Sequence, residues 1–482
     1  MEFDPVDSRL GNARALTAPP RKNAVVPLSI DDVDSDGFGI GKHEGFAVFV
    51  DGALPGDVLR VRLLKIKPRF AYGKIEKILT PSPHRADPAC PVASRCGGCQ
   101  FQHCAYSAQL IFKKRMVEDA LRRIGKVENP PVADVLGMAE PFHYRGKGQF
   151  PAGEGIGLYA PRSHKIIPVA SCHIQHPAHA AILEAARLYL SRYGVPPYDE
   201  NSHTGLVRHV MVKASFSSGE VMAALIINGD RCPWEKELAK LFTDAGASTV
   251  IINPNTKRGN VILGDRFRVL TGDGYIRESV GDITYRLSAR SFFQVNPAQT
   301  KVLYDTALKF GGFTGNETVI DAHAGVGGVA LYAAKQARFV YGVEIVGEAV
   351  DDAVYNAEQN GIKNARFVCG AAEEEVEKII RGKNGGEAEE NISAVFLDPP
   401  RKGCGRALLD AVSFARIPKV IYISCDPATL ARDIKLLREG GYGLEKVQPV
   451  DMFPQTGKVE AVALLTANYY TDVGTGFCRY SL

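Results

Sequence analysis

Residues 318–344 read TVIDAHAGVGGVALYAAKQARFVYGVE, and this stretch gives the clearest indication of how the chain folds. An apolar run ends at Asp321, a glycine-rich turn occupies residues 325–328, and the next apolar run ends at Glu344. Glycines let a backbone turn tightly and come close to a ligand. The pattern predicts a strand, a turn and a helix at the binding edge of an α/β domain.

Three further apolar runs end at Cys369, Asp398 and Cys425, with helical segments between them. Continuous apolar runs that alternate with helices are typical of a doubly wound parallel sheet. We therefore expect an α/β domain over residues 291–482. The polar, glycine-rich stretch 381–391 is predicted to be a surface loop.

The turn after Asp321 suits a nucleoside ligand. It lacks the dinucleotide consensus G-x-G-x-x-G, while Glu344 stands where an acidic side chain accepts hydrogen bonds from ribose hydroxyls. S-adenosylmethionine has no pyrophosphate to bind, so it is the better candidate ligand. Considered alone, the loop is explained equally well as a structural turn.

Two side chains that can take part in a reaction follow neighbouring strands of the predicted sheet. Asp398 opens the sequence DPPRKG, in which two prolines make a rigid shelf. Cys425 precedes a predicted helix, where a thiol is expected to have a lowered pKa and to be a better nucleophile. Glu460, further along the chain, is a candidate base. A loop-capping aspartate and a buried inert cysteine are the alternatives.

The region before the α/β domain has a different composition. Residues 1–22 show no periodicity and are predicted to be a flexible leader. Residues 23–85 contain short β-type runs separated by Gly, Asp and Pro turns, which predicts a small β-barrel. Three basic residues between 65 and 69 stand beside Phe70 and Tyr72, as in single-strand nucleic-acid binders. An ordinary solvated face is the alternative.

A cysteine cluster begins the predicted central domain, residues 86–290. Cys90, Cys96 and Cys99 place three thiols within ten residues, and two glycines between them permit tight wrapping around a metal centre. The spacing fits zinc and an iron–sulfur cluster equally well. By sequence, Cys104 is the nearest candidate for a fourth ligand.

Five motifs together resemble those of the RNA uracil-5 methyltransferases. They are SFFQVN (291–296), the glycine-rich turn, DPPRKG (398–403), SCDPATLARD (424–433) and DMFPQTGKVE (451–460). Their order and spacing match over roughly residues 140–465. The resemblance implies a Rossmann-like S-adenosylmethionine-dependent methyltransferase domain. Residues 23–85 resemble a TRAM domain, an oligonucleotide-binding-type barrel, and the region between is expected to be an α+β domain.

The resemblance also implies roles for individual residues. Cys425 corresponds to the nucleophile and Glu460 to the base, while Gln294, His323, Glu344 and Asp398 correspond to cofactor and uracil contacts. The CGGCxxQH pattern resembles the [4Fe-4S] site of several family members, which implies Cys90, Cys96, Cys99 and Cys172 as ligands. The sequence departs from the family pattern at three positions, namely His323, Ala371 and Lys458.

The implied activity is methylation of uridine C5 in RNA through a covalent bond between Cys425 and C6 of the base. Relatives that carry the cluster mostly act on ribosomal RNA, so 23S ribosomal RNA is the expected substrate. A tRNA enzyme and an RNA-binding relative without activity are the alternatives, and the barrel disfavours a small-molecule substrate. Two segments of the middle region also resemble family segments, which makes Tyr144, Arg145, Lys147, Arg208 and His209 candidate RNA contacts. Surface salt bridges are the alternative.

Composition limits the remaining classes of protein. The chain has 482 residues, 45% of them hydrophobic and 23% charged, which suggests about three globular domains. A net charge of +4 does not by itself identify a nucleic-acid partner. Ten cysteines without an export signal or a membrane-spanning stretch predict reduced thiols and a cytoplasmic protein. We expect a monomer.

Overall fold

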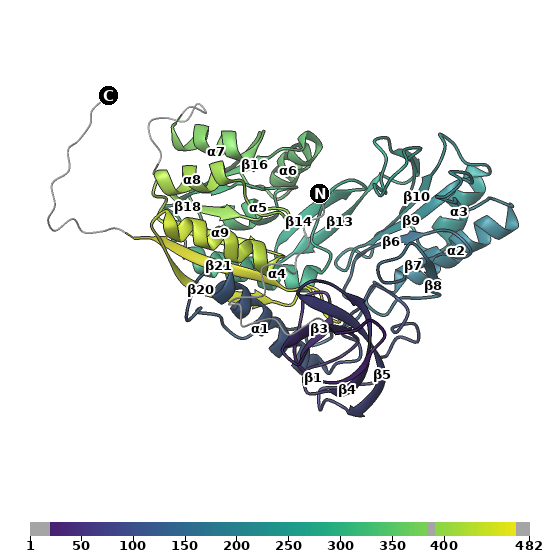
Figure 1. Cartoon of the computed structure of the whole chain (residues 1–482). Helices are drawn as coiled ribbons and strands as arrows, with labels where there is room; N and C mark the ends of the chain where they lie inside the picture. The colour runs from purple at the N-terminus through teal and green to yellow at the C-terminus, as the bar shows by residue number, and fades with distance from the viewer. Residues whose placement is uncertain (1–19, 383–390, 469–482) are drawn as a thin grey trace.

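The structure is a computed structural model, and it describes residues 20–382 and 391–468. Most of the predicted leader 1–22 and most of the predicted loop 381–391 lie outside the described residues. Within the described ranges, no helix combines the length and the apolar character needed to cross a membrane. Figure 1 shows a small barrel, a central sheet and a larger C-terminal α/β domain around a common centre.

The N-terminal strands form a closed barrel, which confirms the predicted β-barrel fold of this region. Its strands are β1 (Val25–Val33), β2 (Phe38–His43), β3 (Phe46–Asp51), β4 (Val58–Ile66) and β5 (Phe70–Thr80). They close in the order β1-β2-β3-β5-β4, with β1 pairing antiparallel to β4. Side chains alternate between the interior and solvent along β1, so that Leu28 and Ile30 join the barrel core.

The central sheet has the strand order β12-β11-β10-β9-β6. Its strands are β6 (Lys147–Pro151), β9 (Val207–Ala214), β10 (Val221–Ile227), β11 (Thr249–Pro254) and β12 (Arg268–Thr271). Helices α2 (Ala178–Arg192) and α3 (Glu235–Asp244) pack near one face, and the hairpin β7 (Gly157–Tyr159) and β8 (Ile166–Pro168) lies beside β6. Strands β9 and β10 are buried along their whole length because both faces of the sheet are covered.

The C-terminal sheet has seven strands in the order β17-β16-β15-β18-β19-β21-β20. The first five are parallel: β15 (Thr318–Asp321), β16 (Phe339–Glu344), β17 (Ala365–Cys369), β18 (Ile392–Leu397) and β19 (Lys419–Ser424). Strands β20 (Tyr442–Val450) and β21 (Glu460–Ala467) are antiparallel. The strand order reverses between β15 and β18, which is where doubly wound sheets bind ligands.

Within the described residues, six helices of the region 297–439 flank this sheet. They are α4 (Pro297–Gly311), α5 (Gly328–Ala334), α6 (Gly347–Gln359), α7 (Ala372–Ile380), α8 (Arg406–Phe414) and α9 (Pro427–Glu439). Asn296 caps α4 by accepting a hydrogen bond from the backbone of Gln299, and Asp426 caps α9 in the same manner. Each cap is followed by a proline at the first helical position, which ends the preceding segment sharply.

The predicted central domain 86–290 covers more than the central sheet. Helix α1 (Tyr106–Arg123) packs on α9, and its Val117 and Leu121 belong to the core of the C-terminal sheet. The hairpin of β13 (Tyr275–Val280) and β14 (Ile283–Ser288) packs on α4 and α6. The cysteine-bearing segment before α1 therefore reaches the C-terminal domain directly.

Candidate active site

A cavity of about 1510 Å³ opens at the carboxyl ends of the parallel strands. Asp321, Glu344, Asp398 and Cys425 end or directly follow strands β15, β16, β18 and β19. Glu460 begins β21, and because β21 runs antiparallel to β19 its first residues lie at the same edge. The predicted residues Gln294, His323, Glu344, Asp398, Cys425 and Glu460 all line this cavity.

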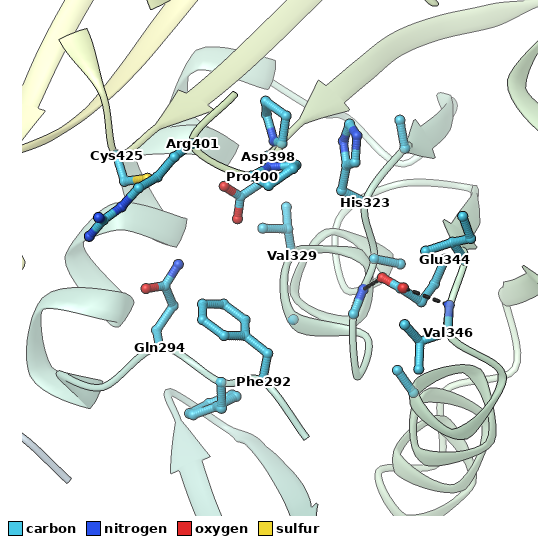
Figure 2. A pocket seen from close by; sticks show the side chains of 18 of the residues that line it. Phe292, Gln294, His323, Val329, Glu344, Val346, Asp398, Pro400, Arg401 and Cys425 are labelled. Carbon is cyan, nitrogen blue, oxygen red and sulfur yellow. Dashed lines mark hydrogen bonds between the residues drawn. The ribbon is translucent and has the colours of Figure 1, made fainter. Parts of the chain in front are cut away.

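Glu344 holds the glycine-rich turn in place. Its Oε2 accepts a hydrogen bond from the Gly325 backbone at 3.0 Å, and its Oε1 accepts one from Val346 at 2.8 Å (Figure 2). Gly325 and Gly327 have φ values of +54° and +89°, which side chains other than glycine disfavour. Each carboxylate oxygen keeps room for a second hydrogen bond, so Glu344 can still accept from ribose hydroxyls.

His323 occupies the turn position where the family pattern has an aromatic residue. Its ring is largely buried in the cavity wall, and its Nδ1 has no hydrogen-bond partner among the described residues. Burial lowers the pKa of His323 to about 4, so the ring is neutral near pH 7. A neutral flat ring in this position can pack against a bound heterocycle.

Two carboxyl groups with raised pKa values stand at the carboxyl ends of the neighbouring strands β15 and β18. Burial, reinforced by the charge of Asp321, raises the pKa of Asp398 to about 7. Burial likewise raises the pKa of Asp321 to about 7, and its Oδ2 has no hydrogen-bond partner among the described residues. Asp398 lines the cavity and can accept a hydrogen bond from a ligand, whereas Asp321 is buried behind the cavity-lining residues of the turn.

Cys425 and Glu460 form an interacting pair. Burial, followed by the charge of Asp398, raises the pKa of Glu460 to about 8, and its Oε2 has no partner in the described part of the chain. Burial also raises the pKa of Cys425 to about 11, and Glu460 adds to this effect while the charge of Arg401 opposes it. A carboxyl group with a pKa near the working pH suits proton transfer.

The predicted lowered pKa of Cys425 is therefore wrong for the ligand-free protein. Burial is the largest cause of the raised pKa, and the charges of Glu460, Asp398 and Asp426 add to it. In addition, Asp426 accepts hydrogen bonds from the backbone of Ala428 and Thr429, both at 2.9 Å, which satisfies the first turn of that helix. The capping carboxylate of Asp426 therefore accepts the backbone N–H groups at the start of α9, which were expected to stabilise the Cys425 thiolate.

The SFFQVN segment supplies the opposite wall of the cavity. Figure 2 shows Gln294 and Phe292 facing the side that carries Cys425, Arg401 and Asp398. Gln294 is buried, whereas Phe292 is 71% exposed. The sequence does not predict a role for Phe292 or Arg401, although Phe292 lies in SFFQVN and Arg401 in DPPRKG. An exposed aromatic side chain on a cavity wall is the signal that only the structure provides.

The other two departures from the family pattern also lie in the cavity wall. Ala371 precedes α7, and Lys458 comes two residues before Glu460. The Lys458 Nζ atom lies 3.0 Å from Oδ1 of Asp36, which belongs to the barrel. Lys458 therefore connects the barrel to the loop that carries Glu460.

The predicted cysteine ligands share one environment. Burial and the neighbouring thiols of Cys172, Cys96 and Cys90 raise the pKa of Cys99 to about 12. Cys104 is separate: it is buried in the apolar cluster around Phe101 and Phe112, and its Sγ lies 3.5 Å from the carbonyl of the next residue. Among the described residues, no group of three or more His, Cys, Asp or Glu side chains is arranged to hold a single metal ion.

The predicted RNA contacts divide into two groups. Arg145 lines the cavity, together with other basic residues, namely Arg290, Arg401, Lys402, Arg406 and Lys458. Arg208 and His209 are buried, and Arg208 donates to the carbonyls of Asn255 and Lys257, so the prediction that they contact RNA is wrong.

Tyr144 is also buried and donates to the Pro454 carbonyl at 2.9 Å, which makes it a structural residue instead of an RNA contact. In the barrel, Phe70 is buried against Phe49 and Tyr72. Phe70 therefore does not offer the predicted stacking surface. The exposed residues Lys65 and Arg69 remain at the barrel surface.

Comparisons with known proteins agree with this arrangement. A family model described as tRNA (uracil-5-)-methyltransferase matches residues 264–468, and a TRAM domain model matches residues 21–75. An uncharacterized RNA methyltransferase of Halalkalibacterium halodurans is 44% identical over 455 residues, which are 93% of this chain and 98% of the relative. One of Caldanaerobacter subterraneus is 43% identical, over 91% of this chain and 97% of the relative.

A solved structure is similar over nearly the whole chain. It is the Pyrococcus abyssi tRNA (uracil-54, C5)-methyltransferase in complex with S-adenosyl-L-homocysteine, with a TM-score of 0.73 and 25% identity. The similarity covers 91% of this chain and 99% of that one. Together with the cavity at the switch point of the sheet, these matches show that the chain belongs to the RNA uracil-5 methyltransferase family.

Proposed function

We propose that the protein methylates C5 of uridine in RNA, with S-adenosylmethionine as the methyl donor and a covalent Cys425 adduct as the intermediate. The observation that carries this proposal is the placement of Cys425 and Glu460 as an electrostatically coupled pair in one cavity with Glu344 and Asp398. A nucleophile, a base and a nucleoside-binding carboxylate are the groups this reaction needs.

The proposed reaction begins at the sulfur atom. The thiolate of Cys425 bonds to C6 of uracil, and the electron pair of the C5–C6 double bond moves toward C5 and the C4 carbonyl. Arg401 favours the thiolate because its charge lowers the pKa of Cys425, against the stronger effect of burial. S-adenosylmethionine, when bound, supplies a methyl group on a positively charged sulfur, which C5 takes as the carbon–sulfur bond breaks.

Glu460 completes the reaction. Its carboxylate removes the proton from C5, the electron pair re-forms the C5–C6 double bond, and the bond from C6 to Cys425 breaks. The proton remains on Glu460. Because burial raises the pKa of Glu460 to about 8, this group can hold that proton near neutral pH and release it afterwards.

The chain offers a fitting site for S-adenosylmethionine. The Glu344 carboxylate can accept hydrogen bonds from the ribose, and Gly325 lines the cavity with open space where a side chain would project. His323 offers a flat neutral surface in the cavity wall, and its Nδ1 has no hydrogen-bond partner among the described residues. This donor set suits a positively charged nucleoside without a pyrophosphate.

For the RNA, we propose 23S ribosomal RNA, because of the cysteine cluster that resembles that of ribosomal RNA enzymes. The basic residues at the cavity and the barrel support RNA binding in general. Transfer RNA is the second candidate, since the solved Pyrococcus abyssi relative is described as a tRNA enzyme. The target uridine must leave its base stack to enter the cavity.

We also propose that Cys90, Cys96, Cys99 and Cys172 bind a [4Fe-4S] cluster. Burial raises the pKa values of Cys96, Cys99 and Cys172, and neighbouring thiols add to this effect. Gly98 donates a backbone hydrogen bond to Sγ of Cys96 at 3.4 Å. A four-iron cluster binds each thiolate at a different iron, so it does not need the compact arrangement of a single zinc ion. Absorbance and iron content of anaerobically purified protein test this, and a colourless zinc protein would overturn it.

Mapping 5-methyluridine in the RNA of cells with and without the gene tests the proposed function. Loss of one or more sites in 23S ribosomal RNA, restored by the wild-type gene and not by Cys425→Ala, is the expected result. Loss confined to transfer RNA would select the second candidate. Unchanged 5-methyluridine in both RNA classes would overturn the proposed activity.

A further inference from the structure

The loop at residues 451–459 joins β20 to β21 and leads directly into Glu460, the first residue of β21. Phe453 and Lys458 line the same cavity as Glu460, so this loop forms part of the wall. Gln455 has a φ of +68°, a left-handed backbone conformation that persists in a residue with a side chain only when its surroundings enforce it. The contacts that enforce it come from a distant part of the chain.

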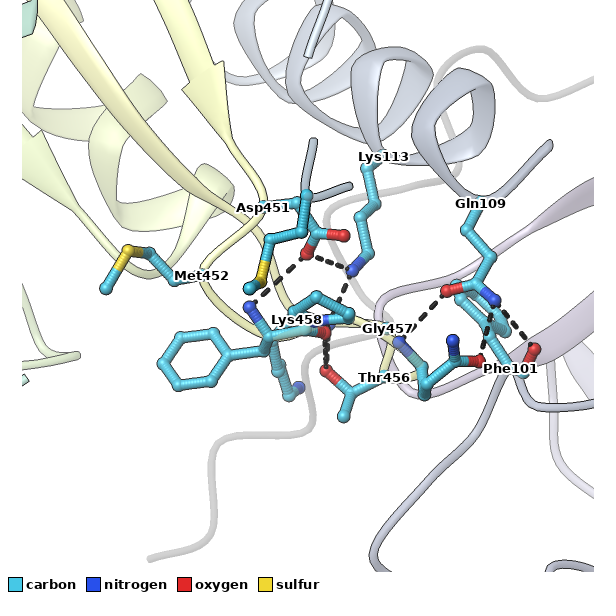
Figure 3. Close-up of polar contacts among 12 residues, drawn as sticks. Phe101, Gln109, Lys113, Asp451, Met452, Thr456, Gly457 and Lys458 are labelled. Atoms are coloured by element: carbon cyan, nitrogen blue, oxygen red, sulfur yellow. Dashed lines mark hydrogen bonds and ion pairs between the residues drawn. The ribbon is translucent and has the colours of Figure 1, made fainter. Parts of the chain in front are cut away.

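Helix α1 supplies most of these contacts from one face. Tyr106, Gln109 and Lys113 are spaced by three and four residues, which places them on the same side of a helix. All three donate hydrogen bonds to the loop, which lies more than 330 positions later in the sequence. Figure 3 shows Gln109 and Lys113 reaching from the helix to the loop.

Lys113 and Asp451 form a fully buried ion pair at the start of the loop. Both side chains are 0% exposed, and Nζ of Lys113 lies 2.6 Å from Oδ1 of Asp451. The same Nζ donates to the Phe453 carbonyl at 3.0 Å, while Tyr106 donates to Oδ2 of Asp451 at 2.9 Å. Each oxygen of the Asp451 carboxylate is thus fixed by a separate residue of α1.

Gln109 fixes the middle of the loop. Its Nε2 lies 3.0 Å from Oε1 of Gln455, and its Oε1 accepts the Gln455 backbone N–H at 3.0 Å. Nε2 also lies within hydrogen-bond distance of the carbonyls of Phe101 and Cys104. The strained residue is therefore held by two contacts from one side chain, which is itself anchored to the cysteine-bearing segment.

The chemistry of these contacts indicates a geometric role. A buried ion pair contributes little net stability compared with an apolar pair of the same size, because both charges lose their hydration. It does impose direction, since hydrogen bonds weaken steeply when they are bent. An apolar helix face would hold the loop as firmly without fixing its conformation.

We propose that Gln109 and Lys113 are positioning residues for the removal of the C5 proton, because they hold the loop that places the Glu460 carboxylate. This role rests on the proposed function, in which Glu460 is the base. The helix face acts on Glu460 and leaves the addition of Cys425 to C6 unaffected. Proton removal and adduct formation are therefore expected to respond differently to changes in α1.

Two substrates separate these steps. A 23S ribosomal RNA transcript, with a tRNA transcript in parallel, requires both the addition and the proton removal. The same transcripts made with 5-fluorouridine require only the addition and the methyl transfer, since the fluorine at C5 is not removed by a base and the adduct persists. Adduct is measured as a protein–RNA band that survives denaturing electrophoresis.

Gln109→Met is the first variant, because it keeps the volume of the side chain and leaves no buried charge. Lys113→Met with Asp451→Leu is the second, since it replaces both charges of the pair together. Lys114→Met is the matched control: Lys114 adjoins Lys113 in sequence, but its ion pair with Asp134 lies at the surface. Glu460→Gln gives the behaviour of an enzyme without the base.

With uridine transcripts, Gln109→Met and the double variant are expected to turn over at least tenfold more slowly, with unchanged KM for RNA, and to accumulate adduct as Glu460→Gln does. With 5-fluorouridine transcripts, their rate of adduct formation is expected to stay within twofold of wild type. Lys114→Met is expected to match wild type on both substrates.

Equal slowing on both substrates would show a general structural role and overturn the inference, as would wild-type turnover in both variants. If Glu460→Gln itself accumulates no adduct while Cys425 still forms one with 5-fluorouridine, the proposed base is wrong, and the inference fails with it. The Glu460→Gln sample distinguishes a wrong assignment of the base from a wrong role for helix α1.

Discussion

Replacing the candidate base should stabilise the protein while it stops turnover. Burial raises the pKa of Glu460 from 4.5 to about 8, with a further contribution from Asp398. A carboxyl group with a raised pKa in the folded state stabilises that state fully below pH 4.5, and the contribution is lost as the pH rises through 8. Glu460→Gln removes the group that ionises, so the variant keeps this stability at high pH.

The magnitude follows from the two pKa values. Each pKa unit corresponds to about 1.4 kcal/mol, so wild type loses about 3 kcal/mol relative to Glu460→Gln by pH 7 and about 5 kcal/mol above pH 8. For a domain of this size, about 1 kcal/mol changes the melting temperature by about 2–4 °C. At pH 9 the variant should therefore melt about 10 °C or more above wild type.

Thermal unfolding followed by circular dichroism at pH 5 and pH 9 measures this difference. Glu445→Gln is the matched control, because Glu445 is an exposed carboxylate on the neighbouring strand β20. The melting-temperature difference between Glu445→Gln and wild type should be the same at both pH values. A melting-temperature difference between Glu460→Gln and wild type that does not change with pH would refute the reasoning that ionisation of Glu460 is suppressed by burial.

Three further predictions concern the cofactors and the pH profile. Cys172→Ala should abolish the iron–sulfur absorbance while Cys104→Ala retains it, and the reverse pattern would identify Cys104 as the fourth ligand. Glu344→Gln should weaken S-adenosylmethionine binding in calorimetry by about tenfold or more, because hydrogen bonds to charged groups contribute about 1.5–3 kcal/mol; an unchanged Kd would count against the ribose contact. The methylation rate should rise from pH 6 to pH 9 as Glu460, with a pKa of about 8, and then Cys425 lose protons; a rate that falls over this range would contradict both roles.

The sequence predicted the parts of the fold that local patterns encode. Apolar runs ending at Asp321, Glu344 and Asp398 mark the ends of parallel strands, and the structure confirms those ends to within one residue. Strand ends then predict a shared edge, because the carboxyl ends of parallel strands meet there. For this reason Glu344, Asp398 and Cys425 can be predicted together with the fold, whereas Gln294 and His323 are implied only by the resemblance to the family.

Contacts between distant segments were not predictable in the same way. Helix α1 lies early in the chain, within the predicted central domain, yet its Lys113 contacts Asp451. No periodic pattern of neighbouring residues indicates such an ion pair. A lysine is buried only when the tertiary structure brings a charged partner close to it. The same holds for the raised pKa of Cys425, which comes first from burial and then from the charge of carboxylates such as Glu460.

The fate of the basic residues shows a second limit. The sequence shows that Arg208 is positively charged. The structure shows that its guanidinium donates hydrogen bonds to the carbonyls of Asn255 and Lys257. Arg145 has the same charge but lines the cavity. Whether an arginine meets solvent or its own backbone is decided by packing, which the residue type does not reveal.

The central claim is that the sulfur of Cys425 bonds to C6 of a uridine, and peptide mass spectrometry of the trapped complex tests it most directly. Protein is incubated with S-adenosylmethionine and a transcript containing 5-fluorouridine, then digested with protease and nuclease. The account predicts a methylated fluorouridine attached to the peptide that contains Cys425, and no attachment in Cys425→Ser. Attachment at another cysteine, or methylation of ordinary uridine by Cys425→Ser at the wild-type rate, would contradict it.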